Sequence, residues 1–243
     1  MKTVTKHRKT GAVIVAAGKG QRLKQNTPKC FLKINGIPLF IIALQAFERA
    51  QEIDEIVLVV PEGFEKSAYE HITTYKVRKC SEIVAGGFKR QDSALNGIKV
   101  LNSDIENILI HDGARCLISE DLIARIVKAL ATESVILPAN QITDTLHRRS
   151  GDFAFPGPTR EDFVTAQTPQ GFHRRILEEA FEKNKNDSLQ FTDEVSMVRG
   201  LLDVKAFIVR GERDNVKITH PEDLNMFKHQ LESKSDIISK VLK

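Results

Sequence analysis

Residues 16–22, AAGKGQR, bring two glycines, a lysine and an arginine together directly after the apolar run VIV. A loop of this kind between a strand and a helix turns backbone N–H groups toward an anion, and a phosphate comes closest where no Cβ intervenes. The pattern therefore predicts a phosphate-binding loop. A tight turn in which Lys19 and Arg22 are only solvated is the alternative.

The spacing of this loop differs from the two common nucleotide-binding motifs. It lacks the GxxxxGK[ST] pattern of P-loops. It also departs from GxGxxG, because Leu23 stands where the third glycine belongs and no acid follows about 20 residues later at a strand end. We therefore expect neither a P-loop NTPase nor a dinucleotide-binding enzyme.

Polar and glycine-rich clusters also follow other predicted strands. Ligands of open α/β sheets bind at the carboxyl edge of the strands, so these clusters are expected to meet the first loop in one site. They are Pro28 with Lys29, Gly86 to Ser93, His111 to Arg115, and Asn215 to Thr219.

Short runs rich in β-branched residues recur along the chain, and segments of helical period lie between most of them. This alternation is typical of βαβ units and predicts an α/β fold with a mostly parallel sheet covered by helices on both faces. The predicted strands lie at residues 11–16, 55–60, 81–85, 107–111, 134–139 and 204–209.

Three helices are predicted from apolar spacing and capping residues. Residues 122–130 carry an apolar stripe behind Ser119, which is a favourable helix N-cap, and two acids. Residues 176–181 repeat the stripe, and Pro221 is placed to begin the last helix. Strands and helices therefore alternate along most of the chain.

Residues 143–163 fit neither period, because turn formers, charges and isolated aromatic residues follow one another irregularly. Such a segment is expected to form an extended arm that packs on another surface, with a partner subunit as the candidate. No internal repeat or linker marks a second domain. We therefore interpret residues 11–232 as one domain with an inserted arm, flanked by a basic tail at 1–10 and a C-terminal tail at 233–243.

The composition favours small anionic ligands over nucleic acids or membranes. The 243 residues carry a net charge of +4, a mild excess without the basic stripe of a nucleic-acid-binding protein. The run GAVIVAAG is too short and too rich in glycine for a signal-peptide core or a membrane span, although a transit segment in the basic tail is an alternative. Three widely spaced cysteines without a CxxC pair indicate no disulfide framework and no zinc site, so we expect a cytoplasmic location.

Seven short motifs follow one another along residues 11–225: AAGKGQR with PK, AGGFKRQDS, HDGAR, TDT, TR before AQTPQGF, TDE with Ser196, and NVKITHPEDL. Together they resemble the cytidylyltransferases that act on sugar-alcohol phosphates, most closely the 2-C-methyl-D-erythritol 4-phosphate cytidylyltransferase family. Motifs in this number and order are far more specific than any one of them, and they cover nearly the whole chain.

The resemblance implies a Rossmann-like nucleotidyltransferase fold and a homodimer joined by the projecting arm. It also implies a magnesium-dependent reaction that joins CTP to a polyol phosphate and releases pyrophosphate. The attacking phosphate oxygen is largely ionised at neutral pH, because the second phosphate pKa is about 6, so no general base is required. The site must instead bring two polyanions together and neutralise charge around the α-phosphorus.

The resemblance also assigns roles to the matching residues of this chain. The catalytic positions are Arg22, Lys29 and Lys217. The positions around the nucleotide are Ala16, Ala17, Gly18, Gly20, Gly86, Gly87, Arg90 and Ser93. The positions that bind the polyol phosphate are Asp112, Arg115, Thr145 and Arg160. The last two lie on the arm and would reach the site of the partner subunit.

Asp112 ends a predicted buried strand, where an unpaired carboxylate would be costly, so a cation is expected beside it. Magnesium usually takes one or two carboxylates plus substrate phosphates, which suits Asp112 with Asp214 as a second candidate. The alternative is a structural ion pair between Asp112 and Arg115.

Several of these residues also have simple structural interpretations. Lys29 and Arg160 would then be solvated, Lys217 would face outward from a strand, and Ser93 would cap a helix. The TDE stretch at Thr192 equally predicts a helix cap with acids in its first turn.

Three residues depart from the family pattern. Cys30 and Cys116 stand where the family usually has the last residues of PKQ and RP, which is compatible with altered packing. His147 stands where the family usually has a hydrophobic residue and lysine after DT, so a cation is replaced by a group mostly neutral at pH 7.

Two other functions compete with this interpretation. Ribitol-5-phosphate cytidylyltransferase shares most of the motifs, and AAG rather than AGG in the first loop favours methylerythritol phosphate. A non-catalytic nucleotide-binding regulatory protein is the alternative of another class. The retained cations disfavour it, because a sensor needs affinity but no transition-state charge balance.

Overall fold

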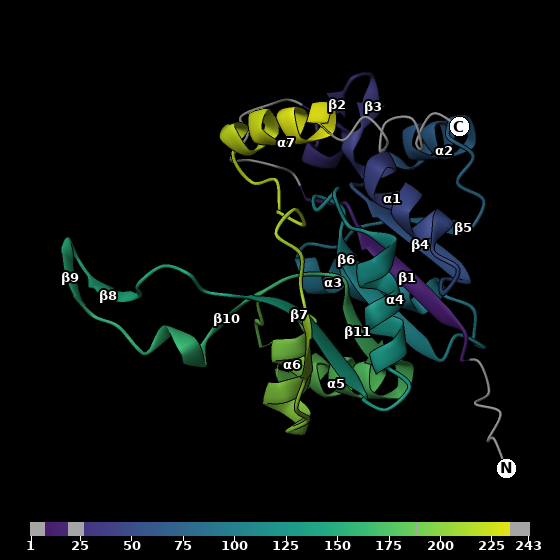
Figure 1. Cartoon of the computed structure of the whole chain (residues 1–243). Helices are drawn as coiled ribbons and strands as arrows, with labels where there is room; N and C mark the ends of the chain where they lie inside the picture. Colours follow the sequence, from purple (N-terminus) through teal and green to yellow (C-terminus); the bar gives the residue numbers. More distant parts are fainter. Residues whose placement is uncertain (1–7, 19–26, 188, 234–243) are drawn as a thin grey trace, which may run out of the picture.

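The computed structural model describes residues 8–18, 27–187 and 189–233 (Figure 1). A sheet of eight strands lies at the centre, and helices cover both of its faces. Most of both predicted tails lies outside the described residues, as does the second half of the predicted phosphate loop.

The central sheet has the strand order β10-β7-β11-β6-β1-β4-β5, with β12 paired to β7. Strands β10 and β11 are antiparallel to their neighbours, whereas the other pairs are parallel. The strands are β1 Thr10–Val15, β4 Glu55–Val60, β5 Cys80–Ala85, β6 Asn107–Asp112, β7 Val135–Gln141, β10 Val164–Ala166, β11 Gln170–His173 and β12 Phe207–Arg210. A small hairpin outside this sheet pairs β2 Lys33–Ile34 with β3 Ile37–Pro38.

All six predicted strands are present, and the mostly parallel sheet is confirmed. The sequence pattern does not predict β10 and β11, because both are short and their residues show no apolar run. In β11 the buried polar side chain of Gln170 and the buried ring of Phe172 flank Gly171, which pairs with Leu109 on one side and Ile136 on the other. Tertiary pairing rather than local preference therefore makes this strand.

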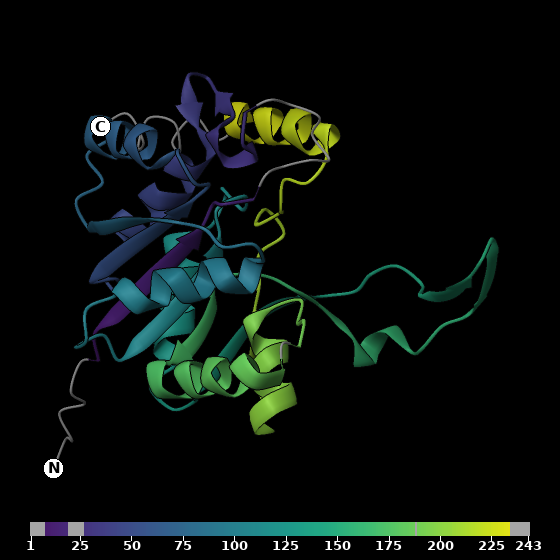
Figure 2. The same ribbon diagram turned by 180° about the vertical axis from the view of Figure 1, so that it is seen from behind.

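The two faces of the sheet have separate cores. On β4, Ile56 and Leu58 point into one core, and Val57 and Val59 point into the other, as the two-residue period of a strand requires. The first core is completed by α1 Leu39–Arg49, α2 Glu65–Thr74, α4 Glu120–Ala129 and α7 Pro221–Ser233. The second, seen from behind in Figure 2, is completed by α3 Arg90–Val100, α5 Arg174–Asp187 and α6 Glu194–Leu202.

The predicted helices form where their capping residues place them. The Ser119 hydroxyl accepts a hydrogen bond from the N–H of Leu122 at the start of α4, and Pro221 is the first residue of α7. Two capping predictions need correction. Asp193 rather than Thr192 caps α6. Helix α3 already begins at Arg90, so Ser93 lies within its first turns and is no N-cap.

The predicted arm projects from the sheet as a hairpin of β8 His147–Ser150 and β9 Phe153–Pro156, followed by the short 3-10 helix η3 Arg160–Asp162 (Figures 1 and 2). Every residue of the hairpin is exposed, and the exposed fraction of Phe153 is 73%. Among the described residues, no helix is both long enough and apolar enough to cross a membrane.

Candidate active site

The loops that follow β1 and β5 are packed against each other at the carboxyl edge of the sheet. A Cβ on Gly86 would lie 2.3 Å from the Cβ of Ala17, so this contact requires glycine. The N–H of Gly87 donates to the Ser93 hydroxyl at 3.0 Å. Of the residues that the resemblance assigns to the nucleotide, Ala16, Ala17, Gly18, Gly86 and Gly87 therefore lie on two adjoining loops, and Ser93 lies beside them in the first turns of α3. Gly20 and Arg22 lie outside the described residues.

Lys29 begins the 3-10 helix η2 Lys29–Phe31, directly after Pro28. Its Nζ donates to the carbonyl oxygen of Ile218 at 2.8 Å, which joins this helix to the segment after β12. Burial lowers the pKa of Lys29, and the nearby charge of Lys217 adds to this effect. Lys29 is thus a half-buried cation held in place, and the simple picture of a solvated loop lysine does not apply.

Asp112 is the last residue of β6 and lies among cations. Its Oδ1 accepts from Nε of Arg90 at 3.0 Å, and its Oδ2 lies 2.7 Å from Nζ of Lys217. Burial alone would raise the pKa of Asp112, but Arg90 and Lys217 together hold that pKa well below its usual range. The prediction that a cation accompanies this carboxylate is confirmed.

Arg115 is a weaker partner of Asp112 than the sequence suggested, because its Nε is 4.0 Å from Oδ2. The guanidinium instead donates to the carbonyl oxygens of Asn215 at 2.8 Å and Ala166 at 3.3 Å. Its Nε makes no hydrogen bond within the described part of the chain. Arg115 therefore links the end of β6 to the segments that carry Asn215 and Ala166.

Glu194 is a member of this cluster that sequence reasoning missed. Both of its carboxylate oxygens accept from Nη1 of Arg90, at 2.6 and 2.7 Å. The predicted nucleotide contact Arg90 thus lies between two carboxylates, which raise its pKa although burial opposes this. The sequence shows Glu194 only as an acid directly after Asp193, at the start of a helix. An acid in the first turn of a helix is more often solvated than buried, so this position alone did not indicate a site residue.

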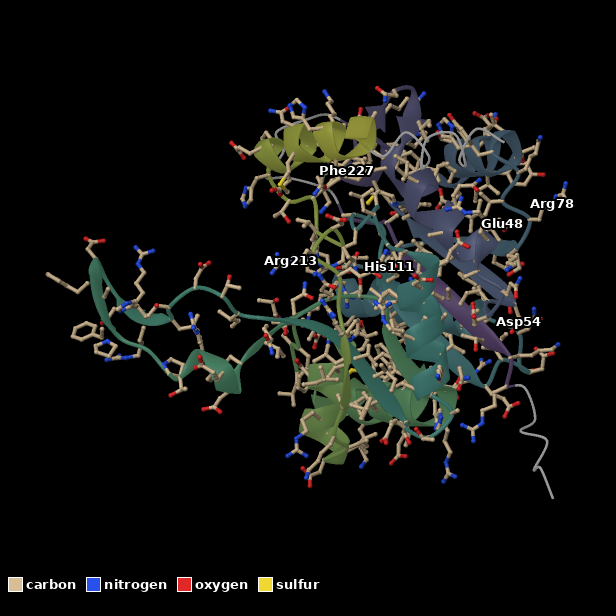
Figure 3. All side chains as sticks on the ribbon, in the orientation of Figure 1. Glu48, Asp54, Arg78, His111, Arg213 and Phe227 are labelled. Carbon is tan, nitrogen blue, oxygen red and sulfur yellow. The ribbon has the colours of Figure 1, made fainter. Side chains whose placement is uncertain are left out.

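A buried hydrogen-bond network holds the end of β6 in place. The Nε2 of His111 lies 3.0 Å from the carbonyl oxygen of Arg115, so in this tautomer Nε2 donates and Nδ1 accepts from the Thr168 hydroxyl at 3.2 Å. The same hydroxyl accepts from the N–H of Asp112 at 3.0 Å. Figure 3 shows His111 inside the molecule. The Thr168 hydroxyl therefore positions the backbone of Asp112.

The neutral state of His111 makes the stability of the fold depend on pH. Burial lowers the pKa of His111 from 6.5 to about 4, so the unfolded chain binds this proton more readily than the native one. The free energy of unfolding is expected to fall as pH drops from 6.5 to about 4, by about 3 kcal/mol in total. Urea unfolding across this range should show a flatter profile for His111→Asn. Parallel profiles for the two proteins would contradict the prediction.

Three predicted site residues remain to be placed. Asp214 lines a groove of about 1870 Å³ between α1, α4 and β12. Thr145 and Arg160 are exposed on the arm, where Nη1 of Arg160 donates to the carbonyl oxygen of Thr143 at 2.6 Å. The arm leads away from the central sheet (Figure 1).

The donors around Asp112 fit a magnesium ion only in part. Among the described residues, no group of three or more His, Cys, Asp or Glu side chains is placed to hold a metal. Asp112 offers one carboxylate. These residues fit an ion whose other ligands are phosphate oxygens of the substrates, which is the usual arrangement for magnesium.

The three departures from the family pattern have different surroundings. Cys30 and Cys116 are buried, and burial raises the pKa of the Cys30 thiol to about 11. Both therefore behave as packing residues in the protonated state. His147 is exposed on the arm, with its Nδ1 3.2 Å from the carbonyl oxygen of Phe155.

Comparison with known families assigns the chain to one of them. The sequence model described as 2-C-methyl-D-erythritol 4-phosphate cytidylyltransferase (IspD) matches residues 10–233. The chain belongs to this family. The family resemblance drawn from the seven motifs is thereby confirmed. Like other 2-C-methyl-D-erythritol 4-phosphate cytidylyltransferase family members, the chain is a nucleotidyltransferase.

Individual relatives agree with this assignment. A 2-C-methyl-D-erythritol 4-phosphate cytidylyltransferase from Clostridium botulinum (strain Loch Maree / Type A3) is 38% identical over 228 residues, which cover 92% of this chain and 98% of that protein. A bifunctional enzyme IspD/IspF from Desulfotalea psychrophila is 34% identical over 96% of this chain, but the match spans only 60% of the bifunctional enzyme.

Solved structures of the cytidylyltransferase family share the fold. The 4-diphosphocytidyl-2C-methyl-D-erythritol synthase from Anaerococcus prevotii superposes with a TM-score of 0.81 and 28% identity, covering 93% of this chain and 97% of that one. The 2-C-methyl-D-erythritol 4-phosphate cytidylyltransferase from Thermus thermophilus gives a TM-score of 0.75 at 28% identity, covering 91% and 98%. The predicted Rossmann-like nucleotidyltransferase fold is confirmed.

Proposed function

We propose that this protein joins CTP to 2-C-methyl-D-erythritol 4-phosphate, releasing pyrophosphate, in the non-mevalonate pathway of isoprenoid biosynthesis. Family membership supports the reaction class. The observation that carries the proposal is the cation cluster of Lys29, Lys217, Arg115 and Arg90 around Asp112, beside the packed glycine loops. A cytoplasmic location suits its free cysteine thiols.

The cluster supplies what transfer of a cytidylyl group needs. The polyol phosphate oxygen attacks the α-phosphorus, and negative charge develops on the equatorial and leaving oxygens. Lys29 and Lys217 stabilise that charge, together with Arg22 from the first loop. In the free protein Lys217 lies 2.7 Å from Asp112, and Lys29 donates to Ile218. Both ammonium groups are thus fixed at the carboxyl edge of the sheet, where we propose that the phosphates bind.

Asp112 and Arg115 bind the polyol phosphate, and Asp112 is also the protein ligand we propose for magnesium. The ion, when bound, neutralises charge on the phosphates. Asp214 is the second, weaker candidate ligand. The carboxylate of Asp112 has two oxygens, of which Oδ1 pairs with Arg90 and Oδ2 with Lys217.

The arm completes the site of a partner subunit in a homodimer. Its aromatic residues Phe153, Phe155 and Phe163 are exposed on one chain, as expected for a segment that packs on a second copy. Thr145 and Arg160 would then contact the polyol phosphate across the interface. Arginine suits this role because its guanidinium recognises phosphate with two parallel hydrogen bonds.

A mixed-dimer experiment tests the shared site. Lys29→Ala and Arg160→Ala are each expected to inactivate the enzyme as pure homodimers. After unfolding and refolding an equal mixture, activity should return to about a quarter of the wild-type level, because half the dimers then contain one intact site of two. Size-exclusion chromatography verifies that dimers form. A mixture that stays as inactive as its parents would contradict an arm that acts in the partner's site.

Pyrophosphate release tests the reaction itself. Purified protein with magnesium and CTP is compared on methylerythritol 4-phosphate, ribitol 5-phosphate and a sugar 1-phosphate, with ATP, GTP and UTP as nucleotide controls. We expect release only with CTP and methylerythritol 4-phosphate. A preference for ribitol 5-phosphate would reassign the substrate, and no release with any pair would overturn the proposal.

A further inference from the structure

Glu194 is the most deeply buried charged side chain near Asp112, with an exposed fraction of 0%. Burial raises the pKa of this carboxyl group, although the adjacent Arg90 works in the opposite direction. A buried carboxylate is tolerated only when it is paired and hydrogen-bonded. Arg90 is the charged partner that meets this condition, because both oxygens of Glu194 accept from its Nη1.

The helix end that carries Glu194 is fixed to the central sheet. The side chain of Gln170, in β11, donates through Nε2 to Asp193 at 2.7 Å and accepts through Oε1 from the N–H of Val195 at 3.1 Å. Gln170 itself pairs with Ile110 of β6, two residues before Asp112. Glu194 and Asp112 are therefore held at fixed places in one frame, with the guanidinium of Arg90 between them.

The way Arg90 divides its donors is informative. Arginine and carboxylate groups often pair through two parallel hydrogen bonds, which would occupy both oxygens of Asp112. Here Arg90 gives Asp112 only Nε and directs Nη1 to Glu194. The second oxygen of Asp112 is consequently left to Lys217.

We propose that Glu194 is a positioning residue for nucleotidyl transfer: it retains Nη1 of Arg90 and so keeps Oδ2 of Asp112 available to Lys217 and the substrates. This inference rests on the proposed function, since it assumes that Asp112 and Lys217 act on the phosphates. Without the Glu194 carboxylate, the Arg90 guanidinium turns onto both oxygens of Asp112 and displaces Lys217.

Glu194→Gln tests this role because it keeps the size of the side chain and removes its charge. We expect kcat to fall about tenfold, while KM for CTP changes less than about threefold, because the Glu194 carboxylate orients a reacting group rather than the bound nucleotide. The matched control is Glu178→Gln, which removes a carboxylate that pairs with Arg174 at 2.7 Å on α5. That control should keep wild-type kcat and KM.

The same substitution in the Asp112→Asn background separates positioning from simple structural support. If Glu194 acts through Arg90 on Asp112, Glu194→Gln should cause no further loss of kcat there. An equal fold-loss in both backgrounds, or wild-type kcat in the single variant, would overturn the inference.

A second readout does not depend on the reaction. Urea unfolding of the wild type, Glu194→Gln, Asp112→Asn and the double variant should give non-additive changes, because Arg90 bridges the two carboxylates. Additive changes would overturn the inference even if the enzyme proves active on another polyol phosphate. A wild type that releases no pyrophosphate, combined with non-additive unfolding, would refute only the proposed reaction and Glu194's part in it, leaving the Arg90 bridge established.

Discussion

Replacing Lys29 with alanine is expected to lower kcat about 100-fold or more, the scale found when one charge-stabilising donor is removed from an active site. Lys29 is half-buried at the start of η2, and its ammonium group lies near the ammonium group of Lys217 and the carboxylate of Asp112. Loss of this cation leaves charge on the transferring phosphate uncompensated at the moment when it is largest. Steady-state pyrophosphate release, with saturating CTP and polyol phosphate, measures the change.

The fold of the Lys29→Ala variant should remain intact, because within the described part of the chain the substitution removes one side-chain hydrogen bond, to the carbonyl oxygen of Ile218. Far-UV circular dichroism and thermal unfolding verify this. Lys33→Ala is the matched control, since Lys33 is an exposed lysine of the nearby β2 strand. It should leave kcat unchanged. Near-normal turnover in Lys29→Ala would remove Lys29 from the mechanism.

Asp112→Asn is expected to reduce both stability and activity. The substitution leaves Arg90 and Lys217 without the carboxylate that lies between them, at a site where the Asp112 side chain is only 10% exposed. Breaking a buried ion pair from one side typically destabilises a protein by about 3 to 5 kcal/mol. We also expect kcat to fall about 100-fold, because Lys217 loses the partner that holds it at the phosphates.

The pH dependence of this variant provides an independent check. The pKa of Asp112 is well below its usual range in the native protein, so its stabilising contribution is present above the unfolded value of 3.8 and is lost as pH falls below it. The stability difference between wild type and Asp112→Asn should therefore begin to narrow below pH 3.8, and at pH 3 it should be smaller than at pH 7 without having vanished. Urea unfolding at pH 7 and at pH 3 measures both differences.

Asp104→Asn is the control for that comparison, because Asp104 forms an ion pair of 2.6 Å with Lys9 that is exposed to solvent. Exposed pairs contribute little to stability, so no measurable change is expected. Equal stability losses in Asp104→Asn and Asp112→Asn would show that burial does not strengthen the Asp112 cluster.

Local sequence patterns were sufficient for most of the fold. The six runs of β-branched residues became strands, Ser119 and Pro221 marked helix starts, and the irregular segment at 143–163 became the projecting arm. These features depend on residues a few positions apart. Local patterns failed where the secondary structure depends on a segment that is distant in sequence. In β11, pairing with β6 and β7 gives strand structure to a short polar segment.

The candidate site was predicted as a set of residues but not as a set of contacts. The order of motifs placed Lys29, Asp112 and Lys217 at the carboxyl edge of the sheet, because parallel strands end there together. The sequence offered Arg115 as the partner of Asp112, since it lies three residues away. In the structure the shorter contacts come from Arg90 and Lys217.

The sequence by itself determined the family, the α/β architecture, the arm and the types of residue available for phosphate chemistry. Only the tertiary structure decided which charges meet. Arg90 lies 22 residues from Asp112 and 104 from Glu194, and no local pattern relates such positions. The physical reason is that a buried charge must find an opposite charge wherever the packing of β6, α3 and α6 brings one within hydrogen-bonding distance.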